Sequence, residues 1–317
     1  MLGAAVATAP QASRRRLTRR RLAGTSVPYL LVAPVVLVMG AILGYPIYNL
    51  VRLSLQKYQL FELLQHHGTY VGLHNFSSVL HDHVFWHTLL RTVVFTAVNV
   101  GVTIVGGTLI ALLLVRVSTW LRLLLTIGLV LVWAMPQVVA VQVWSWMTNS
   151  QNGILNYILT ELHLGNYFQH NWYETTLSQY TMVTTLIVWG ALPFVAITVY
   201  AALSQVPHEL VEAAEIDGAR AWRVFKDVTL PVLMPLLLIL TSLSIIWDFG
   251  AFTQPYLLIG PGQQVQSNYL MSTYLYVEGY GKTDFGRGAA ISLLMLAIVA
   301  ALSFFYVRQM LRVGEEE

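Results

Sequence analysis

The segment HDHVFWH is one place where residue types and spacing could support metal chemistry. It contains His81, His83 and His87, and the last two stand four residues apart, on one face of a helix, as a zinc pair requires. No Asp or Glu lies between His83 and His87, where a zinc protease carries its general base, and no third ligand is evident. We therefore expect an amphipathic helix at a membrane surface and no metal site.

A second candidate is GYGKT, residues 279–283, which contains the Gly-Lys-Thr triplet of phosphate-binding loops. Such a loop also needs an earlier glycine, and that position, counted back from Gly281, is Tyr276. The chain has no cysteine, which excludes disulfides and thiolate metal sites. We expect this chain to hold no catalytic residue, metal or cofactor, so any nucleotide chemistry would belong to a partner.

Composition indicates that much of the chain lies in lipid. Hydrophobic residues make up 56% of the sequence and charged residues only 10%, against about a quarter charged in soluble domains. The net charge of +3 does not indicate nucleic-acid binding, because the basic residues flank apolar runs and are not interleaved with stacking aromatic residues.

Six apolar runs are long enough to cross a bilayer as helices, which takes about 20 residues each. They are too long, and not alternating enough, to be strands of a membrane barrel. The sequence therefore predicts an all-α integral membrane protein with a basic N-terminal tail (1–27) and a six-helix transmembrane domain (28–317). The expected spans are 28–51, 89–115, 123–147, 180–204, 229–250 and 287–309.

The distribution of Lys and Arg predicts the orientation of these spans. Most of the 18 basic residues fall in segments that are cytoplasmic if the N-terminus is cytoplasmic. We interpret the RRRLTRRR tail as a topology signal before an uncleaved anchor, because the following apolar run is too long for a signal peptide. The segments 52–88, 148–179 and 251–286 would then lie outside, where they could receive another protein.

The densest charged segment, HELVEAAEIDGARAWRVFKDVTLP (208–231), separates two apolar runs and would face the cytoplasm. Acidic and then basic residues recur at spacing three, and the pair Asp217-Gly218 stands between them. This pattern predicts two short amphipathic helices joined at Gly218, the second starting at Ala219. The charged residues from Glu209 to Asp227 sum to −2, which suits a basic groove on a protein better than an anionic lipid surface.

The stretch EAAEIDGARAWRVFKDVTLPVLMP closely resembles the EAA loop of ABC importer permeases. The residues that match are Glu212, Ala213, Ala214, Asp217, Gly218, Ala219, Phe225, Leu230 and Pro231. In that family the loop is a coupling helix that inserts into a cleft of the cytoplasmic ATPase. The resemblance implies that loop 207–231 couples to an ATPase through Glu212, Ala213, Ala214, Asp217, Gly218, Ala219, Arg220 and Phe225.

Other segments resemble the carbohydrate-importing group of these permeases. They are YPIYNLVRLSLQKY, WSWMTNSQNGILNYIL, FGAFTQPYLL and YLYVEGYGKTDFGRGAAIS, so the resemblance covers nearly the whole chain from about residue 28. The chain is most similar to the first of two permeases, as in the trehalose importers of mycobacteria and their relatives. It departs from the group's usual pattern at Asp248-Phe249 and at IGPG, which affects substrate detail.

The resemblance implies the type I ABC importer permease fold in a bacterial plasma membrane, with both termini cytoplasmic. It also implies three kinds of partner: a second, different permease subunit, a cytoplasmic ATPase pair that uses ATP and Mg²⁺, and an extracytoplasmic sugar-binding lipoprotein. The chain itself would form half of the pore.

Polar residues inside or near the expected spans are candidates for contact with the sugar, because such groups are costly in lipid. They are Asn99, Gln137, Gln142, Trp247 and Asp248. Hydrogen bonding between helices, or a position near the outer interface, is the alternative for each. Asp248 is the strongest candidate because it is the one carboxylate near an expected pore helix.

Three other functions compete with sugar import. An ion-coupled secondary transporter would carry ionisable groups deep in several spans, whereas these spans are nearly free of charge. An intramembrane enzyme would need an acid–base, metal or Ser/His constellation, and none is evident. A permease for another solute, such as a glycerophosphodiester, would favour a basic pore.

Overall fold

The computed structural model describes residues 14–315, and the side chains of residues 29–309. The basic tail expected at 1–27 therefore lies outside the described side chains. The described chain is almost entirely helical, which confirms the all-α fold class. Its strands are β1 (Gln56–Lys57) and β2 (Thr69–Tyr70), which pair antiparallel with Gln56 opposite Tyr70.

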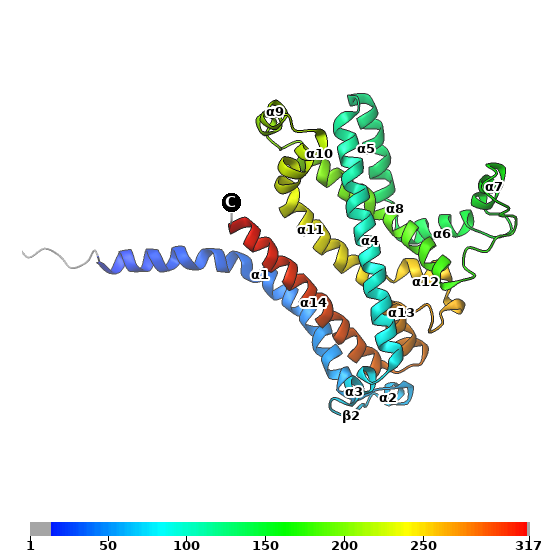
Figure 1. Cartoon of the computed structure of the whole chain (residues 1–317). Helices are drawn as coiled ribbons and strands as arrows, with labels where there is room; N and C mark the ends of the chain where they lie inside the picture. Colours follow the sequence, from blue (N-terminus) through cyan, green and yellow to red (C-terminus); the bar gives the residue numbers. More distant parts are fainter. Residues whose placement is uncertain (1–13, 316–317) are drawn as a thin grey trace, which may run out of the picture.

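Five helical segments of the described chain are long and apolar enough to cross a membrane. They comprise the spanning part of α1 (Arg14–Ser54), then α4 (His83–Arg116), α8 (Thr176–Leu203), α11 (Leu230–Phe249) with the turns before it, and α14 (Phe285–Glu315). In Figure 1, α1 lies along α14 at the edge of the molecule.

The range expected for the third span, 123–147, holds two helices instead of one. They are α5 (Thr119–Trp133) and α6 (Gln137–Met147), and their axes are bent by 99°. The break falls at Pro136, which has no N–H to donate and disfavours helical geometry at the preceding residue. The chain therefore turns sharply where the apolar pattern alone favours a straight helix.

Short helices fill the connections between the spans. They are α2 (Leu60–Leu64), α3 (His74–Leu80), α7 (Ile154–Glu161), α9 (His208–Ile216), α10 (Ala221–Val224), α12 (Thr253–Ile259) and α13 (Met271–Tyr276). Two π-helical turns, Phe225–Thr229 and Val277–Gly281, precede α11 and α14 respectively. A single 3₁₀ turn covers Pro261–Gln263.

The centre of the bundle is the contact between α4 and α8, where glycines allow close packing. A Cβ atom on Gly107 would lie 2.5 Å from Cγ1 of Val195, and one on Gly106 would lie 2.9 Å from Cδ2 of Leu192. Small residues are the usual means by which membrane helices approach, because lipid supplies no hydrophobic driving force between them. The pair Gly106-Gly107 thus sets the distance between the two central helices.

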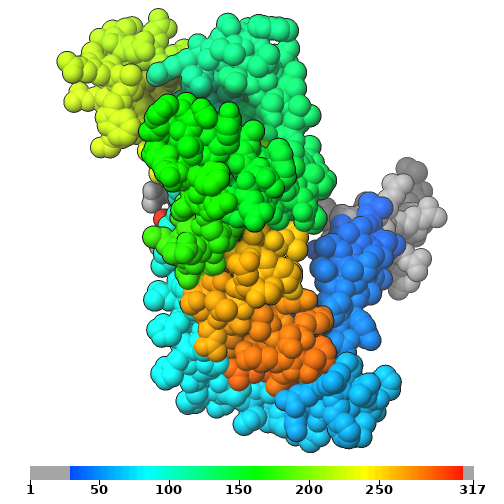
Figure 2. Space-filling model, turned by 90° about the vertical axis from the view of Figure 1, so that its right-hand side faces the viewer, coloured from blue at the N-terminus to red at the C-terminus, as the bar shows by residue number. Residues whose placement is uncertain are grey.

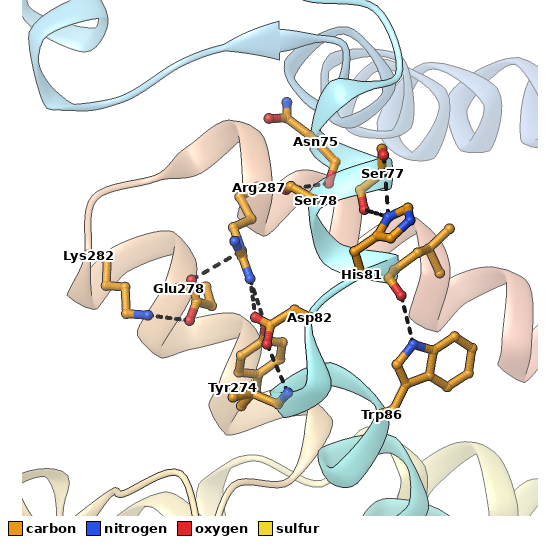
Figure 3. Close-up of polar contacts among 12 residues, drawn as sticks. Asn75, Ser77, Ser78, His81, Asp82, Trp86, Tyr274, Glu278, Lys282 and Arg287 are labelled. Carbon is orange, nitrogen blue, oxygen red and sulfur yellow. Dashed lines mark hydrogen bonds and ion pairs between the residues drawn. The ribbon is translucent and has the colours of Figure 1, made fainter.

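At the lower end of the molecule in Figure 1, five polar side chains join α4 to α13 and α14 (Figure 3). We call them the Asp82 cluster: Asp82, Tyr274, Glu278, Lys282 and Arg287. The Arg287 guanidinium pairs with Asp82 and lies 3.3 Å from the Glu278 carboxylate, to which Lys282 donates at 2.6 Å. Tyr274 donates to Asp82 at 3.1 Å. Burial raises the pKa of Tyr274 to about 12, so this phenol keeps the proton that it donates.

Asp82 also begins α4, because its second carboxylate oxygen accepts from the backbone N–H of Val84 at 2.8 Å. A capping aspartate satisfies an N–H that has no partner inside the helix. Since the same carboxylate pairs with Arg287 at the start of α14, the ends of two spans are held at one point.

Candidate functional site

Helix α9 protrudes from the end of the molecule opposite β2 and α2 (Figure 1). Figure 2 shows the same segment, in yellow-green, projecting at the upper left. Its N-cap is Pro207, and its C-cap is Asp217. Most of its residues are exposed, and none of them is fully buried.

Gly218 turns the chain after α9, as the sequence indicates. Its φ of +80° lies in the left-handed region that favours glycine. The N–H of Ala219 donates to the carbonyl of Ala214 at 3.0 Å, and the N–H of Gly218 donates to that of Glu215 at 3.0 Å. This is the Schellman motif, which satisfies carbonyls at the end of a helix and fixes the direction of the exit.

A second helix follows Gly218, as expected, but it begins two residues later than Ala219 and continues into the next span. Helix α10 begins at Ala221 and runs through the π-helical turn into α11, so that residues Ala221–Phe249 form one 29-residue span. The N–H of Leu230 donates to the carbonyl of Phe225, five residues back. Pro231 explains the wider turn, because it has no N–H for the ordinary bond to Asp227.

The expected coupling residues form a mostly exposed surface at this turn. Glu212, Ala213, Asp217, Gly218 and Arg220 are exposed, while Ala214, Ala219 and Phe225 are half-buried.

Large apolar side chains on the same surface are exposed too: Leu210 by 50%, Ile216 by 79% and Trp222 by 72%. Among the described residues, no ion pair involves the charged side chains of this loop. A surface with exposed aromatic and aliphatic side chains and uncompensated charge is suited to docking a protein.

A pocket of about 460 Å³ opens at the bend between α5 and α6. Its walls come from both of these helices, from α8 and from the end of α11 with the start of α12. Five aromatic residues line it: Trp133, Trp189, Phe194, Trp247 and Phe252. Trp133 is stacked on Phe194 at 6.0 Å, and Phe194 meets Trp247 edge-on at 5.6 Å.

Three of the five expected substrate residues line this pocket: Gln137, Trp247 and Asp248. Gln137 stands at the N-terminus of α6, and Trp247 and Asp248 stand at the last turn of α11. Asp248 is only 7% exposed, and no hydrogen bond or ion pair of its carboxylate is found among the described residues. A buried carboxylate without a partner is costly, so its position indicates a site for hydrogen-bond donors of a ligand.

The other two expected residues lie elsewhere. Asn99 is fully buried between α4 and α8, where it donates to the Phe95 carbonyl at 2.8 Å and approaches Thr184 Oγ1 at 3.4 Å. Gln142 lies on the exposed side of α6. For Asn99 the structure matches the alternative of bonding between helices.

Sequence reasoning missed several lining residues, among them Trp133, Trp189, Phe252, Thr253 and Gln254. Pro136 was the available signal, because proline disfavours a continuous helix and broken helices border cavities in membrane proteins. The signal is not specific, since Pro193 and Pro235 lie inside the unbroken helices α8 and α11. No comparable feature of the sequence predicts that α12 forms part of the pocket wall.

No group of three or more His, Asp or Glu side chains that could hold a metal ion is found within residues 29–309. In the HDHVFWH segment, His81 Nδ1 instead contacts the backbone carbonyl of Ser77 at 2.8 Å (Figure 3).

A helical membrane protein with a polar-and-aromatic pocket among its spans and one protruding charged loop has the architecture of a transport permease. A family model described as "Binding-protein-dependent transport system inner membrane component" matches residues 103–313. The chain belongs to this family, and it is a multi-pass membrane protein.

Curated relatives match along almost the whole chain. The diacetylchitobiose uptake system permease protein DasB of Streptomyces coelicolor is 41% identical, over 93% of this chain and 90% of the relative. The trehalose/maltose transport system permease protein MalF of Thermococcus litoralis is 31% identical, over 88% of this chain and 92% of the relative. The trehalose transport system permease protein SugA of Mycobacterium tuberculosis is 28% identical, over 92% of this chain and 90% of the relative.

A crystal structure of a bacterial alginate ABC transporter, in complex with an alginate pentasaccharide-bound periplasmic protein, contains a chain of the same fold. Its TM-score is 0.77 at 16% identity, with 93% of this chain and 97% of that chain covered. The likeness confirms the ABC importer permease fold.

Proposed function

We propose that this chain is a membrane subunit of an ATP-driven importer for an uncharged disaccharide. The pocket carries this proposal: aromatic rings offer faces for the apolar side of a sugar, and Asp248, Gln137 and Gln254 offer hydrogen-bonding groups for its hydroxyls. None of the described residues that line the pocket is Lys or Arg, which disfavours a phosphodiester substrate.

Two disaccharides are the specific candidates. Trehalose follows from the resemblance of the sequence and from the names of relatives that are 31% and 28% identical. Diacetylchitobiose follows from the name of the relative that is 41% identical. A binding assay of both sugars on the cognate binding protein, followed by uptake into vesicles, separates these two candidates.

The proposed assembly has this chain beside a second, different permease, above a pair of ATPase subunits and below a sugar-binding lipoprotein. ATP and Mg²⁺ would act in the ATPase pair and not in this chain, whose relatives are permease proteins. Exposed apolar and charged side chains on α9 and α10 favour the ATPase as the partner of that end.

The path from the ATPase to the sugar runs through α11. The loop that would dock on the ATPase continues into this helix, and Trp247 and Asp248 stand at its other end in the pocket wall. Twenty helical residues span about 30 Å. Movement of α9 with the closing ATPase would therefore tilt α11 and change the pocket.

The decisive variant is Glu212→Arg, tested in the reconstituted complex. Glu212 would pair with a basic group in the ATPase cleft, and losing one partner of a buried pair costs about 3–5 kcal/mol. We expect uptake to be abolished and the ATPase to dissociate or to hydrolyse ATP without transport.

The matched control is Glu161→Arg at the end of α7, which makes the same charge change on an exposed residue far from α9. It should leave the ATPase bound to the complex, because α7 lies outside the loop that would dock on it. Wild-type uptake together with wild-type ATPase activity in Glu212→Arg would refute the proposed coupling.

A further inference from the structure

Six aromatic rings form a continuous row that leaves the pocket. The ring of Phe252, in the pocket wall, stacks on Tyr256 at 4.8 Å, and both rings contact Tyr276, at 5.2 and 4.9 Å respectively. The Tyr276 ring stacks on Tyr280 at 5.4 Å. Tyr280 then meets Phe285 at 5.8 Å, which meets Tyr58 at 6.4 Å. We call these six residues the aromatic row.

The aromatic row leads away from α9. It passes from α12 through α13 and the π-helical turn to the start of α14, at the end of the molecule that holds α2 and β2 (Figure 1). On the face seen in Figure 2, the gold and orange segments that carry it lie next to each other. In the proposed orientation, this end is where the binding protein releases the sugar.

The rings are accessible and are not packed into the core. Tyr280 is 68% exposed, and the other five are half-buried, so each ring presents part of its surface. Four of the six are tyrosines, which offer a ring face and a hydroxyl together. A sugar also has two aspects, an apolar face of C–H groups and a rim of hydroxyls, so the two chemistries are complementary.

Tyrosine is also common in belts at membrane surfaces, where single rings anchor a helix at one height. Two observations favour a path over a belt. Each ring in the row contacts the next, which an anchor does not require, and the row begins inside the pocket wall at Phe252.

We propose that the aromatic row is a carbohydrate-binding track that guides the sugar from the outer face into the pocket. This inference rests on the proposed function and adds the route by which the substrate arrives. Successive rings replace one another as stacking partners, so no single position holds the sugar strongly enough to stop it.

The test is Tyr280→Leu and Tyr276→Leu in the assembled complex, compared with Tyr280→Phe. We expect the leucine variants to lower the initial rate of uptake of radiolabelled trehalose or diacetylchitobiose by about two- to tenfold, the range for loss of one aromatic contact. Tyr280→Phe keeps the ring and should keep most of the rate. ATP hydrolysis stimulated by the binding protein should remain at the wild-type level.

The matched control is Tyr45→Leu on α1, because Tyr45 is 70% exposed and lies outside both the aromatic row and the segments expected to receive the binding protein. Wild-type uptake in Tyr280→Leu would overturn the track, as would an equal loss in Tyr280→Phe or in Tyr45→Leu. A parallel fall in ATP hydrolysis would also overturn it, since that indicates a structural role. Failure of the wild-type complex to carry either disaccharide is a different result, which contradicts the proposed substrate.

Discussion

At the scale of single residues, Asp248 carries the most specific chemistry in the chain. It is a buried carboxylate at the end of a span, beside Trp247, and it faces a pocket with no described basic residue. Burying a carboxylate away from water costs free energy that a neutral residue of similar shape would not cost. Its presence therefore indicates a functional role.

Replacing Asp248 with leucine should remove the hydrogen bonds that the carboxylate accepts from sugar hydroxyls. A hydrogen bond to a charged group contributes about 1.5–3 kcal/mol, so we expect uptake at low substrate to fall about 10- to 100-fold. Asp248→Asn retains an acceptor and should lose less. The measurement is initial uptake with the sugar-loaded binding protein below saturation.

Ser244→Ala is the control for this series, since Ser244 is buried one turn earlier on α11 and does not line the pocket. It should transport like the wild type. If Asp248→Leu also does so, Asp248 is not a substrate residue.

At the scale of elements, the Asp82 cluster determines how the ends of α4, α13 and α14 meet. Its charges are linked in series: Lys282 to Glu278, Glu278 to Arg287, and Arg287 to Asp82. Glu278 is 4% exposed, so removing Arg287 would leave a nearly buried carboxylate with Lys282 alone. Because Asp82 also caps α4, the loss would extend to the start of that span.

Arg287→Leu should therefore lower the free energy of unfolding in detergent by about 2–4 kcal/mol, somewhat less than for a fully buried pair because Arg287 and Asp82 are partly exposed. Lys57→Leu is the matched control, because Lys57 lies 3.9 Å from Glu62 and its side chain is 56% exposed. Exposed pairs contribute about 0–1 kcal/mol. Equal losses in the two variants, measured by denaturant titration, would contradict the assigned role of the cluster.

The elements also show how far the sequence could be interpreted. Apolar runs predict the positions of the helices well. A spanning segment must satisfy its backbone hydrogen bonds within itself, and the side chains that face lipid must be apolar. The apolar runs fail at Pro136, where one run holds two helices, and they do not show that α10 continues into α11. At Pro136 proline chemistry, not hydrophobicity, determines the backbone.

The candidate sites divide in the same way. The turn at Gly218 could be predicted because its cause is local: a glycine after an amphipathic helix. The pocket could not be predicted in full, because its walls come from segments more than 100 residues apart, from Val132 to Gln254. Asn99 illustrates the limit, since a polar residue in a span bonds a neighbouring helix as readily as a substrate.

At the scale of the whole molecule, the two candidate sites lie on different parts of one bundle and share α11. The protruding α9 precedes that helix, the pocket lies at its far end, and the aromatic row continues from the pocket away from α9. An importer needs this order: a site for the energy source on one side, a route for the substrate on the other, and a helix that connects them.

That order holds only if α9 is cytoplasmic, and the absence of cysteine from the sequence makes a labelling test direct. Single cysteines are introduced as Ile216→Cys on α9 and Leu164→Cys beyond α7, at positions that are 79% and 64% exposed. The membrane-impermeant reagent is a charged maleimide, applied to right-side-out vesicles. We expect Leu164→Cys to react at once and Ile216→Cys to react only after permeabilisation, because most Lys and Arg residues would then lie inside.

If the ATPase docks on α9, adding it should also slow labelling of Ile216→Cys in permeabilised vesicles and leave Leu164→Cys unaffected. The reverse sidedness would exclude α9 as the contact for a cytoplasmic ATPase, whatever the pocket binds.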